Sequence, residues 1–309
     1  MIVIDWLLDS DPSIRWQVLR DLSDAPAEAV AAERARIATE GWGARLLGMQ
    51  APDGMWGGRP WSQDWTDTFH VLDLLRQFGL DPKSEQATWA LDLVRDRVTW
   101  KGGAPVDTPW DKNPFFVGEV EPCINGRVVG IGSYFGQDVA ALVERLLGEQ
   151  LPDGGWNCEV ENGATVSSFG TTINVLEGLL EHERATGDAR VAAARLRGEE
   201  YLLVRRLLRR LSTGEVIDDA WTHFSFPTYH FYDVLRGLEH LRASSADPSD
   251  PRIAEALDVV ERRRVEDGRW LLENVHRGEV PFPIDEGEGW PSRWNTLRAM
   301  RVLRWAGRT

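Results

Sequence analysis

Apolar residues recur every three or four positions along most of the chain, which is the spacing of one face of an α-helix. Alternation of apolar and polar residues, the pattern of a half-buried strand, is nearly absent. The sequence therefore predicts an all-α protein. We expect a first helix from Asp11 to Leu22 and a second from Pro26 to about Gln50.

A second group of predicted helices shares one order of residues, with small or polar side chains first and aliphatic ones after them. Segments of this kind begin near residues 62, 132, 167, 225 and 292. Segments richer in Arg, Glu and Ala alternate with them at 83–98, 189–211 and 251–264. This alternation predicts helical hairpins, with the first kind of helix inside and the second kind outside.

One stretch of sequence occurs twice with little change, at residues 45–56 and 145–156, and an eroded copy occupies 264–270. Both full copies contain Arg-Leu-Leu-Gly, then Gln, then Pro-Asp-Gly and Trp. Pro-Asp-Gly favours a sharp turn at a helix end. We expect the Trp ring to fold back over that helix end and the Gln amide to bond open backbone groups. We call this stretch the staple and interpret it as a structural link between hairpins.

The Gln-x-x-x-Gly-x-Trp pattern of the staple resembles the QW motif of squalene and other triterpene cyclases. The α/α toroid of those enzymes is shared with the β subunits of protein prenyltransferases. The resemblance covers the chain from about Trp42 to Trp305. It implies that residues 1–309 form a single α/α toroid of five to six hairpins, as a divergent member of this group.

Two connections are longer than a hairpin needs, at residues 100–132 and 271–291. Both contain several Pro, Gly and aromatic residues. Long apolar loops in a compact fold often cover a binding site. We therefore expect these loops to be lids or pocket walls, or else insertions that plug the toroid.

Charge and hydropathy narrow the range of partners. The formal net charge is −14, and the one short basic run, at 205–210, is typical of a solvated helix face. Nucleic acid and anionic membrane are therefore not expected as main partners. No stretch approaches 18 consecutive apolar residues and the N-terminus lacks the features of a signal peptide, so we expect a cytoplasmic protein without a transmembrane segment.

The starts of the inner helices are expected to converge on one mouth of the toroid, where helix N-termini suit an anionic or carbonyl-bearing ligand. Aromatic and polar residues gather at these starts. In a terpene cyclase such rings stabilise carbocations, and an aromatic-rich core is the alternative. The candidate cavity-lining residues are Trp65, Phe69, Tyr134, Phe169, Trp221, Phe226, Tyr229, His230, Trp294 and Asn295.

Candidate acids follow from the same resemblance. A class II cyclase protonates an alkene or epoxide with the middle Asp of a D-x-D-D-T motif, and residues 64–68 resemble this motif. Asp64 and Asp67 are present, but Thr66 stands where the proton donor belongs. A hydroxyl is too weak an acid for that step, so ordinary class II cyclisation is not expected. Asp218 and Asp219 are a second candidate, as a like-charge pair with one raised pKa, and an exposed capping pair is the alternative.

A metal site is also considered. Protein prenyltransferases hold zinc with an Asp-x-Cys pair and a His, and this chain carries Thr66 and Asn295 where that resemblance would require Cys and His. Cys123, Cys158 and His276 are nevertheless predicted at one mouth of the toroid. Two Cys, one His and a water would form an open zinc site, and unrelated polar loop residues are the alternative.

Three hypotheses on function follow. The first is a cyclase-like or prenyltransferase-like enzyme that acts on a hydrophobic, isoprenoid-like small molecule in the toroid cavity. The second, which Thr66 favours, is a binding or scaffold toroid that has lost cyclase chemistry. The third is a zinc enzyme. A roomy aromatic cavity would favour the first hypothesis, and a toroid plugged by its own loops would favour the second.

Overall fold

The computed structural model describes residues 3–100 and 112–308. Outside the helices of this described part, only isolated bridges occur and no strand forms. The α-helices are α1 (Val3–Leu8), α2 (Pro12–Asp21), α3 (Ala27–Ala35), α4 (Gly41–Leu47), α5 (Thr68–Phe78), α6 (Glu85–Arg97), α7 (Pro122–Tyr134), α8 (Ala140–Gly148), α9 (Phe169–Thr186), α10 (Ala189–Leu203), α11 (Val234–Ala243), α12 (Ala254–Arg262) and α13 (Arg293–Trp305).

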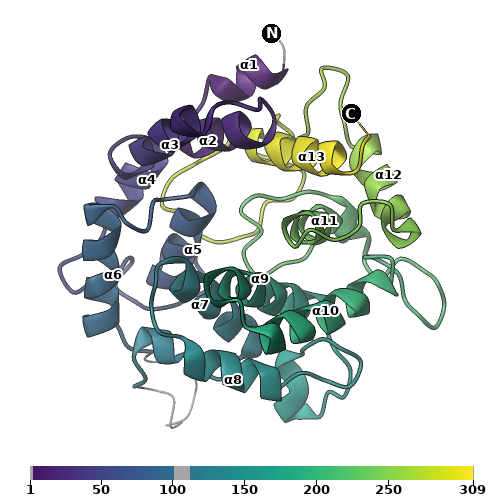
Figure 1. Cartoon of the computed structure of the whole chain (residues 1–309), viewed down its shortest axis with the longest axis horizontal. Coiled ribbons are helices and arrows are strands. Elements are labelled where there is room, and N and C mark those ends of the chain that lie inside the picture. Colours follow the sequence, from purple (N-terminus) through teal and green to yellow (C-terminus); the bar gives the residue numbers. More distant parts are fainter. Residues whose placement is uncertain (1–2, 101–111, 309) are drawn as a thin grey trace.

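The helices form a closed ring with two layers (Figure 1). Helices α2, α5, α7, α9, α11 and α13 form the inner layer, and α13 packs against α2 to close it. The helices that alternate with them along the chain lie outside. This arrangement is the predicted α/α toroid. None of the helices formed by the described residues has the length and apolar character that crossing a bilayer requires.

Capping residues mark most of the predicted helix starts. Asp11 caps α2, Ser168 caps α9 and Ser292 caps α13, each by accepting a hydrogen bond from a backbone N–H two or three residues further on. Asp67 caps α5 in the same way. The polar residues that precede these inner helices therefore satisfy N–H groups that the helix itself leaves open.

Two predicted boundaries are wrong. The helix expected from Pro26 to about Gln50 is divided into α3, the 3-10 helix η1 (Arg36–Ala38) and α4, because the chain turns at Gly41, which has a φ of 65°. The loop expected at 100–132 ends before Pro122, where α7 begins. Residues 101–111 of that loop lie outside the described residues.

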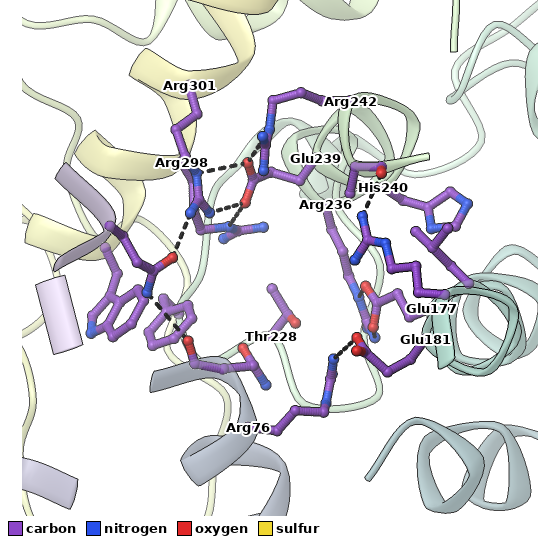
Figure 2. Close-up of a pocket in the computed structure, with 17 residues that line it drawn as sticks. Arg76, Glu177, Glu181, Thr228, Arg236, Glu239, His240, Arg242, Arg298 and Arg301 are labelled. Carbon is purple, nitrogen blue, oxygen red and sulfur yellow. Dashed lines mark hydrogen bonds and ion pairs between the residues drawn. The ribbon is translucent and has the colours of Figure 1, made fainter. Parts of the chain in front are cut away.

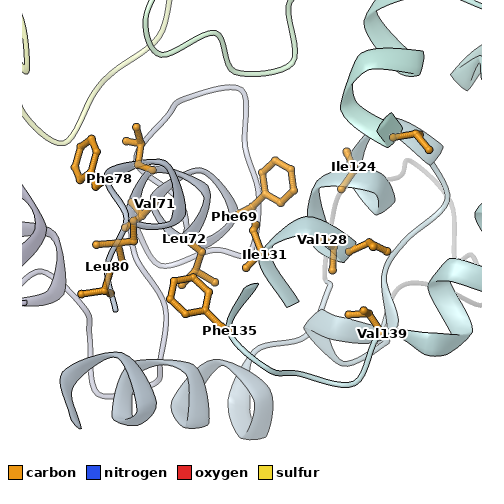
Figure 3. Close-up of a cluster of buried hydrophobic side chains, with 14 of the residues drawn as sticks. Phe69, Val71, Leu72, Phe78, Leu80, Ile124, Val128, Ile131, Phe135 and Val139 are labelled. Carbon is orange, nitrogen blue, oxygen red and sulfur yellow. The ribbon is translucent and has the colours of Figure 1, made fainter. Parts of the chain in front are cut away.

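The glycines of α7 hid this helix from the sequence pattern. Gly126 and Gly130 each lower helix propensity by about 1 kcal/mol relative to Ala. In the toroid they face Gly178 of α9, where an added Cβ would collide with the carbonyl oxygen of Gly126. The two helix backbones therefore touch, and this packing outweighs the poor propensity. Apolar side chains of α5 and α7, such as Leu72 and Val128, fill the space beside them (Figure 3).

The staples link the layers as predicted from the repeated stretch. The indole Nε1 of Trp56 donates to the carbonyl oxygen of Leu46 at 2.7 Å, and its backbone N–H donates to Thr68 Oγ1 at 3.1 Å. The Gln50 amide donates to Gly54 and Ala90 carbonyls, both at 3.0 Å. One outer helix end, the next outer helix and the following inner helix are thus joined by one turn.

The second staple has the same bonds, and the third keeps those of its Trp. Trp156 donates to Leu146 and Thr172, while Gln150 donates to Gly154 and Ala194. Trp270 donates to the carbonyl of Val260 at 2.8 Å and to Thr296 Oγ1 at 3.0 Å. In the third staple Arg264 stands in the place of the Gln, and its guanidinium lies 5.5 Å from the centroid of the Trp270 ring.

Residues 224–233, which lead into α11, fill part of the interior of the toroid. Phe226 stacks on Trp294 with ring centroids 4.1 Å apart, and Tyr229 stacks on Trp65 at 3.8 Å. The 271–291 loop also packs inward, since the backbone N–H of Trp65 donates to the Glu279 carbonyl at 2.9 Å. Among the cavities that the described residues form, one lies at the N-terminal ends of α5 and α7 and another near the C-terminal ends of α5, α9 and α11.

Candidate active site

The first cavity, which we call the aromatic pocket, has a volume of about 390 Å³. Its walls come from the first turns of α5 and α7 and from the loops that precede α5 and α11. Aromatic rings form much of its surface, and a small set of polar groups lies among them. Its lining residues are Trp61, Gln63, Trp65, Phe69, His70, Glu121, Cys123, Ile124, Arg127, His230, Phe231 and Arg277.

A buried Asp–His pair lies in the wall of this pocket. The Asp67 carboxylate accepts the backbone N–H of His70 on Oδ1 at 3.0 Å, and its Oδ2 lies 2.7 Å from His70 Nδ1. The N–H and hydroxyl of Ser62 also donate to Oδ2, at 3.0 and 3.1 Å. Both side chains are buried, with 1% of His70 and none of Asp67 exposed. The cap that starts α5 therefore also fixes the orientation of the imidazole.

The protonation of His70 follows from this contact. A carboxylate oxygen only accepts hydrogen bonds, so Nδ1 carries the proton and Nε2 of the neutral ring is an acceptor. Burial lowers the pKa of His70 below its usual value, and the Asp67 hydrogen bond opposes this shift without reversing it. Among the described residues, Nε2 has no hydrogen-bond partner. The pocket thus contains a neutral base whose acceptor atom is unused.

Arg127 of α7 supplies unused donors beside this base. Its Nη2 donates to Asp73 at 2.5 Å, whereas its Nε and Nη1 have no partner among the described residues although the side chain is buried. The Arg127 guanidinium lies 4.6 Å from the centroid of the Phe69 ring, and the His70 ring lies 4.9 Å from the same centroid. One aromatic ring therefore positions both groups.

The orphaned atoms indicate what the pocket holds. A buried polar atom without a partner costs about 1–3 kcal/mol, and most such atoms in proteins are satisfied by protein, water or ligand. In the wall of this pocket, Arg127 offers two unused donors and His70 offers one unused acceptor. A hydroxyl group both accepts and donates hydrogen bonds through a single oxygen atom.

The sequence-predicted cavity residues are divided among different sites. Trp65, Phe69 and His230 line the aromatic pocket, whereas Phe226 and Trp294 line the second cavity. The remaining ones lie in neither cavity. Phe169 packs on Trp221, and Tyr229 lines a third, smaller pocket. Asn295 bonds the Phe224 and Leu271 carbonyls, and Tyr134 bonds Arg34 and the Leu80 carbonyl at the far end of α7.

Tyr134 was expected at an inner helix start and is found at a helix end, because α7 begins at Pro122. The same displaced boundary concealed Arg127, Ile124 and Glu121, which lie in the first turns of α7. Inner helices were predicted from polar residues at their starts. Glu121 followed by Pro122 fits this pattern and could have located the start of α7.

The other predicted acids lie outside the aromatic pocket. Asp64 accepts the backbone N–H of Glu279 at 3.3 Å and so holds the 271–291 loop. Asp218 and Asp219 are exposed, and Asp218 caps the 3-10 helix η4 (Asp219–Thr222) by accepting the N–H of Ala220. The structure therefore leaves no carboxyl pair of the expected kind at these positions.

The two cysteines meet at the rim of the aromatic pocket, with a different third residue from the one expected. One ligand atom each from Glu121, Cys123 and Cys158 lies within 4.8 Å of the others. The hydrogen bond between the thiols lowers the pKa of Cys158, and the same bond together with burial raises that of Cys123. His276 lies apart, with Nε2 3.0 Å from Ser225 Oγ and its ring stacked on Phe231.

The second cavity, which we call the arginine cavity, differs in character (Figure 2). Its volume is about 240 Å³. Six arginines and three glutamates line it, together with polar residues and a few apolar ones. The charged lining residues are Arg76, Arg184, Arg236, Arg242, Arg298, Arg301, Glu177, Glu181 and Glu239.

Comparisons with known proteins find solved terpene cyclase structures to which this chain is similar. No protein-family model and no curated protein sequence matches the chain. A variant of the type II terpene cyclase MstE from Scytonema, in complex with its substrate geranylgeranyl dihydroxybenzoate, is 15% identical, with 97% of this chain and 88% of that chain covered and a TM-score of 0.46.

Two further solved structures are similar. The apo form of MstE is 17% identical, with 96% of this chain and 86% of that chain covered and a TM-score of 0.44. The ent-copalyl diphosphate synthase of Streptomyces platensis is 16% identical, with a TM-score of 0.43, and the match covers 99% of this chain and 50% of that one. The chain thus resembles type II terpene cyclases, and at these values the likeness concerns the fold alone.

Proposed function

We propose that the chain is an enzyme that acts on a hydroxyl group of an apolar, isoprenoid-like small molecule bound in the aromatic pocket. The observation that carries this proposal is the unpartnered Nε2 of His70, held by Asp67 and set among aromatic rings. The volume of about 390 Å³ lies at the small end of the range of about 300–1,000 Å³ that is typical of small-molecule sites.

The chemistry follows from the two polar groups. The substrate hydroxyl donates its proton to Nε2 of His70, and Asp67 stabilises the imidazolium that forms. Arg127 faces the oxygen that becomes negative, with Nε–H and Nη1–H as donors. The site is therefore built for base-assisted deprotonation of a hydroxyl. It is not built for protonating an alkene, since Thr66 occupies the position of the acid.

The experiment locates the ligand in the aromatic pocket. Farnesol, an apolar alcohol, is titrated into the protein by isothermal calorimetry. Ile124→Trp, which fills the aromatic pocket, is expected to abolish binding. Leu180→Trp, the matched control that fills the arginine cavity, is expected to bind as the unchanged protein does. Circular dichroism verifies that both variants fold, because overpacking costs about 1–3 kcal/mol. Equal binding by both variants would refute the proposal.

A binding or scaffold toroid without catalysis is the alternative, and the filling of the interior by residues 224–233 agrees with it. Either function can use the Nε2 atom of His70 to hold the hydroxyl of farnesol, so affinity alone does not separate them. A binding module releases farnesol unchanged, whereas the proposed enzyme converts its alcohol substrate. Mass spectrometry of the alcohol after incubation with the protein therefore separates the two functions.

A zinc centre at the pocket rim is a second candidate function, favoured by the cluster of Glu121, Cys123 and Cys158. Two sulfurs and one carboxylate oxygen are a donor set that suits zinc, and three protein ligands leave one coordination position for a substrate. When bound there, the metal would supply Lewis-acid chemistry. These residues differ from the set expected from the sequence, in which His276 was the third ligand.

Metal content by plasma mass spectrometry tests this second candidate. We expect about one zinc per chain, lost in Cys158→Ser and in Glu121→Gln. His276→Ala is the matched control and is expected to keep the metal, because His276 bonds Ser225 and lies apart from the cluster. Purified protein free of metal, under conditions in which both thiols titrate as reduced, would overturn the candidate.

A further inference from the structure

The arginine cavity stands at the opposite end of the inner helices from the aromatic pocket, and the proposed reaction makes no use of it. The protein as a whole carries a net charge of −14, yet arginines outnumber glutamates by six to three among the residues that line this cavity. Figure 2 shows their side chains converging from several helices on one space.

Two of these arginines are fully engaged by the protein. Arg236 forms two hydrogen bonds of 2.7 Å with Glu177 and also donates to backbone carbonyls of residues 229 and 231. Arg301 bonds Glu239, Gln17 and Asp21. These residues hold inner helices together, as a structural network would.

Arg298 and Arg242 are not satisfied in this way. Arg298 is 5% exposed, and its Nη1 donates to the Ser225 carbonyl at 2.8 Å and to Asn295 Oδ1 at 3.3 Å. Its Nε and Nη2, however, lie 3.7 and 3.9 Å from carboxylate oxygens of Glu239 and Asp233, beyond hydrogen-bond distance. Arg242 makes a single hydrogen bond among the described residues, from Nε to Glu239 at 3.3 Å. Donors of both side chains therefore face the cavity without close acceptors.

The carboxylates around these arginines do not reach every guanidinium donor. Arg242, Arg298 and Arg301 all approach the carboxylate of Glu239 (Figure 2). Arg301 also contacts Asp21 at 3.3 Å, and Arg298 lies 3.9 Å from Asp233. Burial alone would raise the pKa of Glu239, but the three arginines hold it below its usual value. Burial lowers the pKa of Arg242; Glu239 and Asp21 offset part of this shift, and Arg301 adds to it.

A purely structural role does not account for these two side chains. Arginines near helix C-termini interact favourably with the helix dipole by about 0.3–1 kcal/mol, and Arg242 lies in the last turn of α11. That effect needs one cation, and Arg242 alone provides it. It does not explain why Arg242 and Arg298 both keep donors without close acceptors in a cavity of about 240 Å³.

We propose that the arginine cavity binds a small multivalent oxyanion of the phosphate or polycarboxylate class. Guanidinium groups match the paired oxygens of both classes and bind them through charge-assisted hydrogen bonds. The bound oxyanion accepts from Arg298 and Arg242, and Thr228 on the opposite wall offers a hydroxyl. This inference is independent of the function proposed for the aromatic pocket.

The test is thermal unfolding of the full-length protein with pyrophosphate, and with sodium chloride at matched ionic strength. We expect a rise in Tm that saturates with pyrophosphate and is absent with chloride, because only a specific ligand stabilises by mass action. Arg242→Gln is expected to raise the half-saturating concentration at least about tenfold. Arg190→Gln, an exposed ion-pair partner on an outer helix, is the matched control and is expected to change nothing.

Two further measurements sharpen the result. Glu239→Gln removes the competing carboxylate and is expected to bind pyrophosphate more tightly while unfolding at a lower Tm without it. Citrate in place of pyrophosphate distinguishes a polycarboxylate ligand from a phosphate ligand. The anion that saturates the rise in Tm at the lower concentration identifies which of these two classes the cavity prefers. A Tm that does not respond, that responds equally to chloride, or that responds equally in Arg242→Gln would overturn the proposal. Arg242→Gln is chosen over Arg298→Gln because the Arg242 side chain is 23% exposed and its loss disturbs folding less than that of the buried Arg298.

Discussion

The aromatic pocket and the arginine cavity are built from the same inner helices and differ in what their polar groups do. In the aromatic pocket, His70 and Arg127 are each held by one carboxylate and keep other atoms unpaired. In the arginine cavity, most charges are neutralised by one another, and donors without close acceptors remain on Arg242 and Arg298.

The difference follows from the two ends of an inner helix. At the N-terminal ends, Asp67 satisfies the helix N–H groups and the neighbouring positions are free to carry aromatic rings and a base. At the C-terminal ends, side chains point into a narrow interior where burying a lone charge costs several kcal/mol. Charge pairs therefore accumulate there, and one end of the toroid suits apolar molecules while the other suits anions.

The largest effect on stability is expected from removing the Arg236 side chain, which lines the arginine cavity. Arg236 is 4% exposed, and Arg236→Gln leaves the partly buried Glu177 without its ion-pair partner and two backbone carbonyls without their donor. We expect a loss of about 3–5 kcal/mol in the free energy of unfolding, measured by urea denaturation. Arg190→Gln, whose ion pair is exposed, should lose less than about 1 kcal/mol. A similar small loss for Arg236→Gln would mean that the network is not structural.

Removing the ring of Tyr229, which packs beside the aromatic pocket, should have the next largest effect on stability. Tyr229→Ala deletes the ring that stacks on Trp65. We expect a loss of about 3–5 kcal/mol if the space stays empty, measured by the same denaturation. Because the aromatic pocket would then be larger, longer isoprenoid alcohols should gain affinity relative to farnesol. Unchanged selectivity for chain length would show that Tyr229 does not bound the pocket.

Farnesol binding in the aromatic pocket should depend on pH through His70. Only neutral His70 accepts a hydroxyl proton, and its pKa lies below the usual 6.5, so farnesol affinity should be constant above pH 6.5 and fall only at lower pH. Because unfolded His70 takes up a proton at a higher pH than the native residue, its contribution to stability also decreases as the pH falls below 6.5. Calorimetric titrations over this range test the first point. Farnesol affinity that falls while the pH is still above 6.5 would contradict the buried setting of His70.

The smallest effect is expected from the exposed acids. Asp218→Asn and Asp219→Asn lie outside both cavities. Their unfolding free energies should change by no more than about 0.5 kcal/mol, and farnesol binding should be unaffected. A loss of binding in either variant would assign these residues a role that their positions do not support.

The fold could be predicted from the sequence because its signals are local. Ser168 and Ser292 are capping residues that mark the starts of α9 and α13 in the sequence. The turns before Trp56 and Trp156 are specified by the Pro-Asp-Gly residues shortly before each Trp. The exception is α7, whose Gly126 reads locally as a helix breaker. Its role is a close contact with α9, which no local pattern reveals.

The candidate site could be predicted only in part, since its chemistry depends on contacts between distant residues. Asp67 was expected as an acid and is found as the partner that orients His70, which was not among the predicted site residues. Arg127 belongs to the misplaced helix. The arginine cavity draws on side chains from positions 76 to 301, and nothing in their spacing indicates that they meet.

The central claim is that Nε2 of His70 receives the hydroxyl of an apolar ligand. The most direct measurement compares the Kd of farnesol with that of farnesene, which has the same chain without the hydroxyl, in the unchanged protein and in His70→Asn. Asn keeps a donor for Asp67 and lacks the Nε2 acceptor. We predict that farnesol binds about tenfold more tightly than farnesene in the unchanged protein and that His70→Asn abolishes this preference. An equal preference in both proteins, or none in either, would contradict the account.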